Sequence, residues 1–223
     1  VNEAFEGKLI NDPQTDKKLT LSGGNYVIFN PTGGQNGPTG TVQVSGWSTI
    51  DVASGSSVRL ESDLTMGGSE QNFIINEGAS LDVSGTLNNI NDVLLTGNVV
   101  NNGTIDLTLA DKTLTGDKLT ISGNYSGGEG ARLNMSVDPR NNTADGLVIN
   151  GDVSGTTEIY LTAASAAVPN GNILLVDAPN NVSGTAESFG VWRYEGSPYT
   201  WETLFENNQW YTYVSDGDRP GIV

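Results

Sequence analysis

Hydrophobic residues recur at every second position of this chain in short runs, and glycine, asparagine, serine and threonine interrupt each run. In residues 119–138, LTISGNYSGGEGARLNMSVD, two alternating runs flank a turn rich in Gly, Asn and Ser. Residues two apart lie on one face of a β-strand. No stretch shows the 3.6-residue period of an amphipathic helix. The pattern therefore predicts an all-β chain built from short strands.

The same unit returns at a nearly constant spacing. Each copy has a glycine turn and then an apolar-x-apolar triplet, as in GSSVRL, GASLDV, GTIDL, GARLNM and GTTEIYL. The opening glycines are Gly55, Gly78, Gly103, Gly130 and Gly155, and the steps between them are 23, 25, 27 and 25 residues. Repeats of this length are typical of solenoid folds, in which each unit stacks on the one before it.

Stacked repeats would bury the apolar side chains that a single short strand leaves exposed. In such a coil Val58, Leu81, Ile105 and Leu133 would line one interior column, while Asp82 would point outward to solvent. Backbones would hydrogen-bond to the coils above and below at about 4.8 Å, and Gly and Asn would form the corners. We predict a right-handed parallel β-helix with roughly seven or eight coils. An antiparallel β-sandwich is the alternative.

Aromatic residues gather near the C-terminal end. Nine of the sixteen aromatic residues fall between residues 189 and 213. The open end of a solenoid exposes strand edges and an apolar interior, which large rings are suited to cover. We predict an aromatic-rich C-terminal β-hairpin cap that includes Trp192, Tyr194, Trp201, Trp210 and Tyr211. A carbohydrate-binding aromatic platform is the alternative for this cluster.

The amino-acid composition excludes most catalytic mechanisms. The chain has no cysteine and no histidine, so disulfides, thiol nucleophiles and His-dependent triads are excluded. Its net charge of −16 disfavours nucleic acid. Asp82 and Asp106 fall at matching repeat positions, and paired carboxylates cleave glycosidic bonds in some proteins. We expect a non-enzymatic protein without cofactor or metal; a glycan-binding or glycan-cleaving β-helix is the alternative.

From residue 119 onward the chain resembles the C-terminal passenger region of pertactin-like autotransporters. The likeness rests on an L-x-I-x-G-x-Y strand, a D-x-L-x-I-x-G-x-x-x-G-x-T strand pair and a G-x-x-L-x-x-V strand. The matching or approximating positions are Leu119, Ile121, Gly123, Tyr125, Asp145, Leu147, Ile149, Gly151, Gly155, Thr157, Gly171, Leu174, Leu175 and Val176. The closing WYTYVS, residues 210–215, is similar to the family's final hairpins. Before residue 119 the chain resembles the family only in the style of its β-helix.

This resemblance implies two parts, stalk coils in residues 1–118 and C-terminal coils with an autochaperone cap in residues 119–223. Passengers of this family are exported with the help of their own C-terminal outer-membrane β-barrel. Many act at the bacterial cell surface as adhesins or other virulence factors, so a host-cell receptor is a further implied partner. No signal peptide or barrel is recognisable here. We therefore expect a passenger fragment that serves as stalk and folding nucleus.

Overall fold

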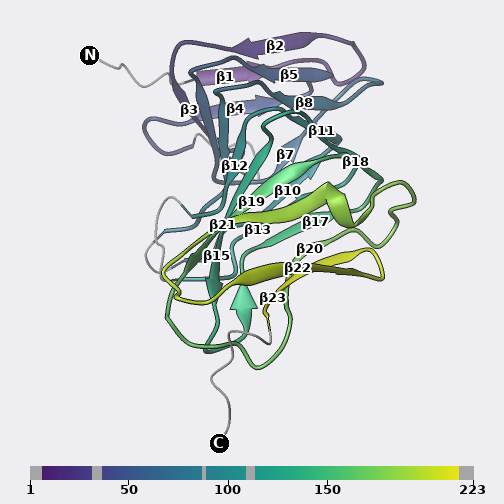
Figure 1. The fold of residues 1–223 in the computed structure, drawn as a ribbon. Helices are drawn as coiled ribbons and strands as arrows, with labels where there is room; N and C mark the ends of the chain where they lie inside the picture. The colour runs from purple at the N-terminus through teal and green to yellow at the C-terminus, as the bar shows by residue number, and fades with distance from the viewer. Residues whose placement is uncertain (1–6, 32–36, 87–88, 109–113, 216–223) are drawn as a thin grey trace, which may run out of the picture.

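The computed structural model describes residues 7–31, 37–86, 89–108 and 114–215. Within these ranges the chain is a stack of β-coils without an α-helix, and one 3₁₀ turn, η1 (Ala186–Ser188), precedes the C-terminal strands. Figure 1 shows the purple N-terminal strands at one end of the stack and the yellow C-terminal strands at the other. The predicted all-β parallel solenoid is confirmed.

Three sheets form the walls of the stack. The ten-stranded sheet contains, in spatial order, β1 (Gly7–Ile10), β4 (Val42–Ser45), β3 (Asn25–Ile28), β6 (Ser57–Leu60), β9 (Ser80–Asp82), β12 (Thr104–Asp106), β15 (Arg132–Asp138), β19 (Thr157–Ala163) and β21 (Phe189–Glu195), with β16 (Thr143–Ala144) beside β15. The seven-stranded sheet contains β22 (Trp201–Glu206), β23 (Gln209–Val214), β20 (Ile173–Asp177), β17 (Gly146–Ile149), β13 (Lys118–Ile121), β10 (Asp92–Thr96) and β7 (Leu64–Thr65). The six-stranded sheet contains β18 (Val153–Gly155), β14 (Tyr125–Gly127), β11 (Asn98–Asn101), β8 (Asn72–Ile75), β5 (Thr49–Val52) and β2 (Lys18–Leu21).

The stack has about six coils rather than the seven or eight predicted. A regular coil takes one strand from each sheet, as β8, β9 and β10 do. Two parts of the chain depart from this pattern. Near the N-terminus, β4 lies between β1 and β3 in the ten-stranded sheet. After β20, β23 runs antiparallel to its neighbours. Dividing the chain length by the repeat step therefore overestimates the number of coils.

The interior column predicted from the repeats is present. Val58 pairs with Leu81, Leu81 with Ile105, and Ile105 with Leu133, always between parallel strands. Ile159 extends this column in β19. All five side chains are fully buried. Stacking like residues on one another lets each short strand share a continuous apolar core, which is the source of stability in a solenoid.

Close packing fixes the corners between the seven-stranded and six-stranded sheets. Asn98 Oδ1 accepts a hydrogen bond from the backbone N–H of Asn124 at 2.9 Å, and Asn124 Oδ1 accepts one from Asp152 N–H at 2.8 Å. A Cβ added at Gly123 would lie 2.6 Å from the carbonyl oxygen of Gly97. The repeated Gly-Asn pairs thus satisfy backbone donors in a place where a side chain would clash.

Leu81→Asp is expected to destabilise the protein by several kcal/mol, because it places an unpaired charge inside the column. Leu94→Asp is the matched control. Leu94 lies on the outer face of β10 and is 37% exposed, so the same substitution is expected to cost within about 1 kcal/mol. Thermal melts of both variants measure the difference. Equal losses would show that the inward and outward assignments are incorrect.

Candidate functional site

The C-terminal cap begins with a reversal of strand direction. β23 pairs antiparallel with both β20 and β22, so the hairpin of β22 and β23 continues the seven-stranded sheet past its last parallel strand. Asn207 and Asn208 form the two-residue turn, both with positive φ (52° and 61°). Such turns match the right-handed twist of the flanking strands. The predicted C-terminal hairpin is therefore present.

A continuous row of rings joins this hairpin to the interior of the coils. The ring centroids of Tyr125 and Phe189 are 5.4 Å apart, those of Phe189 and Trp210 are 5.0 Å apart, and those of Trp210 and Phe205 are 4.6 Å apart. Trp210 is fully buried, and its Nε1–H donates to the carbonyl oxygen of Thr185 at 3.1 Å. We call these four rings the aromatic spine. Ring pairs of this kind add to the stability that area burial supplies.

Buried hydrogen bonds hold the inner end of the aromatic spine. The hydroxyl of Tyr125 receives a hydrogen bond from Asn101 Nδ2 at 3.1 Å and shares one with Thr157 Oγ1 at 2.8 Å. Burial raises the pKa of Tyr125 to about 12, so its hydroxyl stays neutral. The ring is therefore fixed between β11 and β19 as well as packed against Phe189.

A second apolar cluster lies beside the aromatic spine. Its buried members are Ile173, Trp201 and Val214. Tyr194 stacks on Trp201 with centroids 4.3 Å apart and ring planes 11° apart. The indole Nε1–H of Trp201 donates to Ser197 Oγ at 3.2 Å. Strands β20, β21, β22 and β23 thus share this cluster, which joins the hairpin to the last strand of the ten-stranded sheet.

The five aromatic residues chosen from the sequence separate into three groups. Trp201 and Trp210 are buried, and Tyr194 packs on Trp201. Tyr211 is half-buried and pairs between Leu174 and Leu204. Trp192 is 69% exposed, because the register of β21 shifts between Val191 and Arg193 and leaves Trp192 outside the strand pairing. No contact between Trp192 and another ring occurs among the described residues.

Three spine residues are absent from the set chosen by sequence. Phe189 and Phe205 lie within the aromatic-rich segment, and membership of that segment is the only sequence signal for them. Tyr125 lies 64 positions before Phe189, but it is the tyrosine of the L-x-I-x-G-x-Y segment. Its contact with the cap is a property of the fold that local spacing does not reveal.

The other two sheets end on side-chain acceptors. Asp152 Oδ1 accepts the backbone N–H groups of Val182 and Ser183, both at 2.8 Å, and Asn181 Oδ1 accepts that of Val153 at 3.2 Å. Hydrogen bonds from Ser183 lower the pKa of Asp152 to about 2. On the ten-stranded sheet, Val191 N–H donates to Thr203 Oγ1 at 2.9 Å. These hydrogen bonds satisfy backbone N–H groups at the C-terminal end of the stack, where a further coil would otherwise supply the acceptors.

A ladder of polar side chains runs along the outer face of the ten-stranded sheet. Register pairs place one member on each successive strand: Arg59, Asp82, Asp106, Asn134, Tyr160 and Arg193. We call this row the outer ladder. Asp82 and Asp106 are paired across β9 and β12, as their matching repeat positions indicate.

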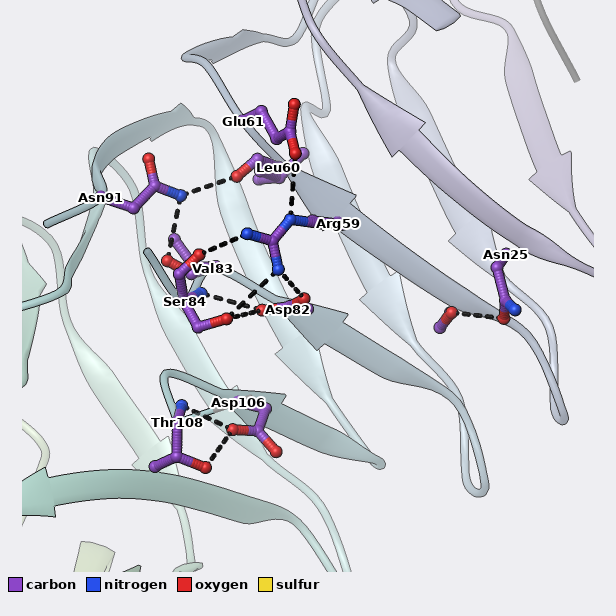
Figure 2. Close-up of polar contacts among 11 residues, drawn as sticks. Asn25, Arg59, Leu60, Glu61, Asp82, Val83, Ser84, Asn91, Asp106 and Thr108 are labelled. Atoms are coloured by element: carbon purple, nitrogen blue, oxygen red, sulfur yellow. Dashed lines mark hydrogen bonds and ion pairs between the residues drawn. The ribbon is translucent and has the colours of Figure 1, made fainter. Parts of the chain in front are cut away.

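The prediction that Asp82 is a solvated surface residue is wrong. Arg59 Nη1 lies 2.5 Å from Asp82 Oδ2, and Asp82 is only 7% exposed. Asp82 Oδ1 accepts the backbone N–H of Ser84 at 2.8 Å and its hydroxyl at 2.6 Å. Figure 2 shows these contacts. It also shows the equivalent arrangement one coil later, where the backbone N–H and the hydroxyl of Thr108 both donate to Asp106 Oδ1 at 2.7 Å. The outward direction is right, but the guanidinium covers the carboxylate.

These contacts give both carboxylates a structural role. Each holds the residue two positions ahead in its own turn, and Asp106 Oδ2 also accepts Asn134 Nδ2 at 2.7 Å. Within the described residues, no group of three or more acidic side chains is placed to hold a metal ion. No described helix is long and apolar enough to cross a membrane.

A third carboxylate, Asp145, is fully buried at the corner before β17. Its oxygens accept three backbone N–H groups, from Ser136 at 2.6 Å, Gly116 at 2.9 Å and Asp117 at 3.1 Å. Burial is the largest influence and raises the pKa of Asp145 from 3.8 to about 7, with the charge of Asp117 acting in the same direction. Asp145 is the first residue of the D-x-L-x-I-x-G segment, so this position of the motif joins three parts of the fold.

Asp82→Asn is expected to destabilise the protein by about 1–3 kcal/mol, because it removes one partner of a largely buried charged hydrogen bond and leaves Arg59 with only the more exposed Glu61 as a carboxylate partner. Asp106→Asn is the matched control at the equivalent repeat position. It loses no ion pair, and the Asn134 amide can rotate to accept instead, so it is expected to cost less than about 1 kcal/mol. Chemical unfolding measures both. An Asp82→Asn loss no larger than that of Asp106→Asn would contradict the assigned role of Arg59.

The protein is expected to lose stability as pH rises through the range set by Asp145. Because the folded pKa lies above 3.8, the contribution of Asp145 is fully present below about pH 4 and is lost as pH passes 7. Asp145→Asn removes this titration, so its melting temperature is expected to fall less between pH 5 and pH 8 than that of the parent. Asp92→Asn, at an exposed site, is the control and is expected to retain the parent's pH dependence.

No protein-family model matches the chain. The chain is 32% identical over 151 residues to "Uncharacterized protein YuaQ" of Escherichia coli (strain K12), a match that covers 65% of this chain and 10% of that protein. It is 24% identical over 188 residues to "Probable autotransporter YfaL" of the same organism, covering 73% of this chain and 15% of that protein. The chain thus spans a small part of both relatives. Together with the stacked parallel strands, the second likeness fits an autotransporter passenger-like β-helix, and nothing in these comparisons points to catalysis.

Proposed function

We propose that this chain is a non-catalytic stretch of a bacterial autotransporter passenger, in which the coils form a stalk and the C-terminal cap nucleates folding as an autochaperone. The observation that supports this proposal most directly is the aromatic spine, which runs from the hairpin into the coils through ring contacts of 4.6–5.4 Å. The likeness to a probable autotransporter supports the passenger assignment.

The cap has the features of a folding nucleus. The repeats of a solenoid contact only their neighbours, so folding begins wherever local stability is greatest. β22 and β23 pair across a two-residue turn, whereas parallel strands such as β9 and β12 pair residues 24 positions apart, as in Leu81 and Ile105. Shorter loops close at lower entropic cost. Buried rings also bring more apolar area to the cap than the Val and Leu triplets bring to a coil.

The cap also offers the next coil a surface on which to form. Trp210 packs against Phe189, and Phe189 packs against Tyr125, whose hydroxyl forms hydrogen bonds with β11 and β19. An ordered cap therefore fixes the interior of the last coils, and their strand edges then template the strands above them. Folding would spread from the C-terminal end toward the N-terminal end.

The composition suits export in an unfolded state. A chain without cysteine forms no disulfide that would lock it before transport. In this proposal the export partner is a C-terminal outer-membrane β-barrel of the same polypeptide, and the stalk stands at the bacterial cell surface or is released from it. The stalk supports an adhesin or other virulence factor, with a host-cell receptor as partner.

Trp210→Ala and Trp201→Ala are expected to slow refolding of the whole chain, because each removes a buried ring from the cap. Truncating a buried Trp costs about 3–5 kcal/mol, and a loss within the nucleus appears in the folding rate. Trp192→Ala is the matched control, since Trp192 is 69% exposed, and it is expected to refold at the parent rate. Stopped-flow tryptophan fluorescence after denaturant dilution measures the rates.

Limited proteolysis across a denaturant series gives an independent measurement. Residues 119–223 are expected to stay protected at denaturant concentrations where the earlier coils are already cut. If the N-terminal coils were the more resistant part, and if both buried-Trp variants refolded as fast as the parent, the autochaperone role would have to be abandoned.

A further inference from the structure

The outer ladder ends in a pocket. An open hollow of about 330 Å³ lies on the outer face of β12, β15, β19 and β21, and four members of the outer ladder line it: Asp106, Asn134, Tyr160 and Arg193. The rest of the lining consists of Arg132, Thr108, Leu161, Thr162 and Glu195, and the carboxylate of Glu195 is paired with Arg193. Adjacent strands lie about 4.8 Å apart, so these four members span about 14 Å. The lining is mainly polar, unlike the apolar lining of most drug-sized ligand sites.

Arg132 is the least satisfied charge in this pocket. Its guanidinium carbon lies 4.1 Å from the centre of the Tyr160 ring, so the ring holds it in place by a cation–π contact. Arg59 and Arg193 each contact a carboxylate, at 2.5 Å from Asp82 and 2.8 Å from Glu195. Among the described residues, Arg132 has no carboxylate at ion-pair distance. A fixed guanidinium with free donors is suited to bidentate binding of a carboxylate.

The rest of the pocket alternates acceptors and donors. Asn134 gives one amide hydrogen to Asp106 at 2.7 Å, which orients its amide and leaves its oxygen as an acceptor. Arg193 contributes further donors, and Thr162 contributes a hydroxyl. A ligand hydroxyl both donates and accepts, so a molecule with several hydroxyls can satisfy such a row. The polar lining disfavours lipid, and the net charge of −16 disfavours polyanions such as nucleic acid.

We propose that this pocket binds a saccharide that carries a carboxylate, with Arg132 holding the carboxylate and the Asp106–Asn134 pair holding ring hydroxyls. The span of the four strands accommodates more than one sugar ring. This proposal does not depend on the folding role of the cap, because the pocket lies on the outer face of the coils and the aromatic spine lies inside them.

The test is a ¹⁵N NMR titration of the full chain with three probes. Methyl glucuronide has both the carboxylate and the hydroxyls, methyl glucoside has the hydroxyls alone, and acetate has the carboxylate alone. Saturable shifts of the Asn134 side-chain amide and the Arg132 Nε–H are expected with the glucuronide. Its affinity is expected to exceed that of either other probe by about tenfold or more, since the glucoside lacks the charge-assisted hydrogen bond to Arg132 and acetate lacks the hydroxyl hydrogen bonds.

Variants separate the two halves of the site. Arg132→Gln is expected to remove the advantage of the glucuronide over the glucoside, and Asn134→Ala is expected to weaken both. Arg140→Gln removes the same charge at an exposed arginine outside the pocket lining and is expected to change nothing. Circular-dichroism melts check that each variant folds, and Arg132→Lys, which keeps the charge but not the bidentate geometry, should give an intermediate affinity.

Several results would overturn this proposal. Acetate binding as tightly as the glucuronide would show a carboxylate site without sugar recognition. Glucoside binding as tightly would remove the role of Arg132. The absence of a saturable shift, or a loss with Arg140→Gln equal to that with Arg132→Gln, would show that the pocket is not a specific site. All of these readouts leave the refolding rates of the tryptophan variants unaffected, so the two proposals fail or succeed separately.

Discussion

Parallel pairing between coils is the interaction on which the rest of this structure depends. Strands of two to seven residues bury too little to be stable alone, so each one takes its backbone hydrogen bonds and its apolar neighbours from the coils on either side. Because pairing is in register, like positions stack, and Leu81 lies on Val58 and beneath Ile105. The same register brings Asp82 against Arg59 on the outer face. One constraint thus orders both the core and the surface.

The same constraint makes the ends of the stack the difficult places. The last coil has no neighbour to supply hydrogen bonds or to cover its interior. The three sheets meet this problem in two ways. The seven-stranded sheet reverses direction into the hairpin, and the other two end on side-chain acceptors from Asp152, Asn181 and Thr203. The aromatic spine then fills the interior. The cap also contains the hairpin of β22 and β23, whose strands pair across a two-residue turn, which is why folding is proposed to begin there.

The sequence predicts the inside of this fold better than its outside. Alternation of apolar residues at i and i+2 identifies the interior column correctly, because burial of one face is a local property of a strand. The burial of Asp82 depends on Arg59, which lies 23 residues earlier in the chain. The signal was available: both residues occupy the middle of an apolar-x-apolar triplet, so stacking the repeats pairs their opposite charges. Comparing the middle residues of successive triplets would have found this ion pair.

Aromatic composition locates the cap but does not orient its rings. Trp192 and Trp210 look alike in the sequence, yet Trp192 lies at a register shift and faces solvent, while Trp210 is fully buried. A bulge changes which side of the strand a residue occupies, and nothing in the neighbouring residues marks it. The number of coils was overestimated for a related reason. β4 and the antiparallel hairpin use chain length without adding a coil, and both are departures from the repeat rather than copies of it.

Alternation along a strand lets one segment serve two purposes. In β15 Leu133 faces the column while Asn134 faces the pocket, and in β19 Ile159 and Tyr160 divide in the same way. The interior residues must fit their neighbours above and below, which restricts them to similar apolar shapes. The outer residues meet no such restriction, provided that charges are paired or solvated. A solenoid can therefore keep similar apolar residues in its interior column while the residues of its outer ladder differ, here from an ion pair to an amide to an aromatic ring. On this view the outer ladder is a surface that can vary from coil to coil, as long as its buried members, such as Asp82, keep their partners.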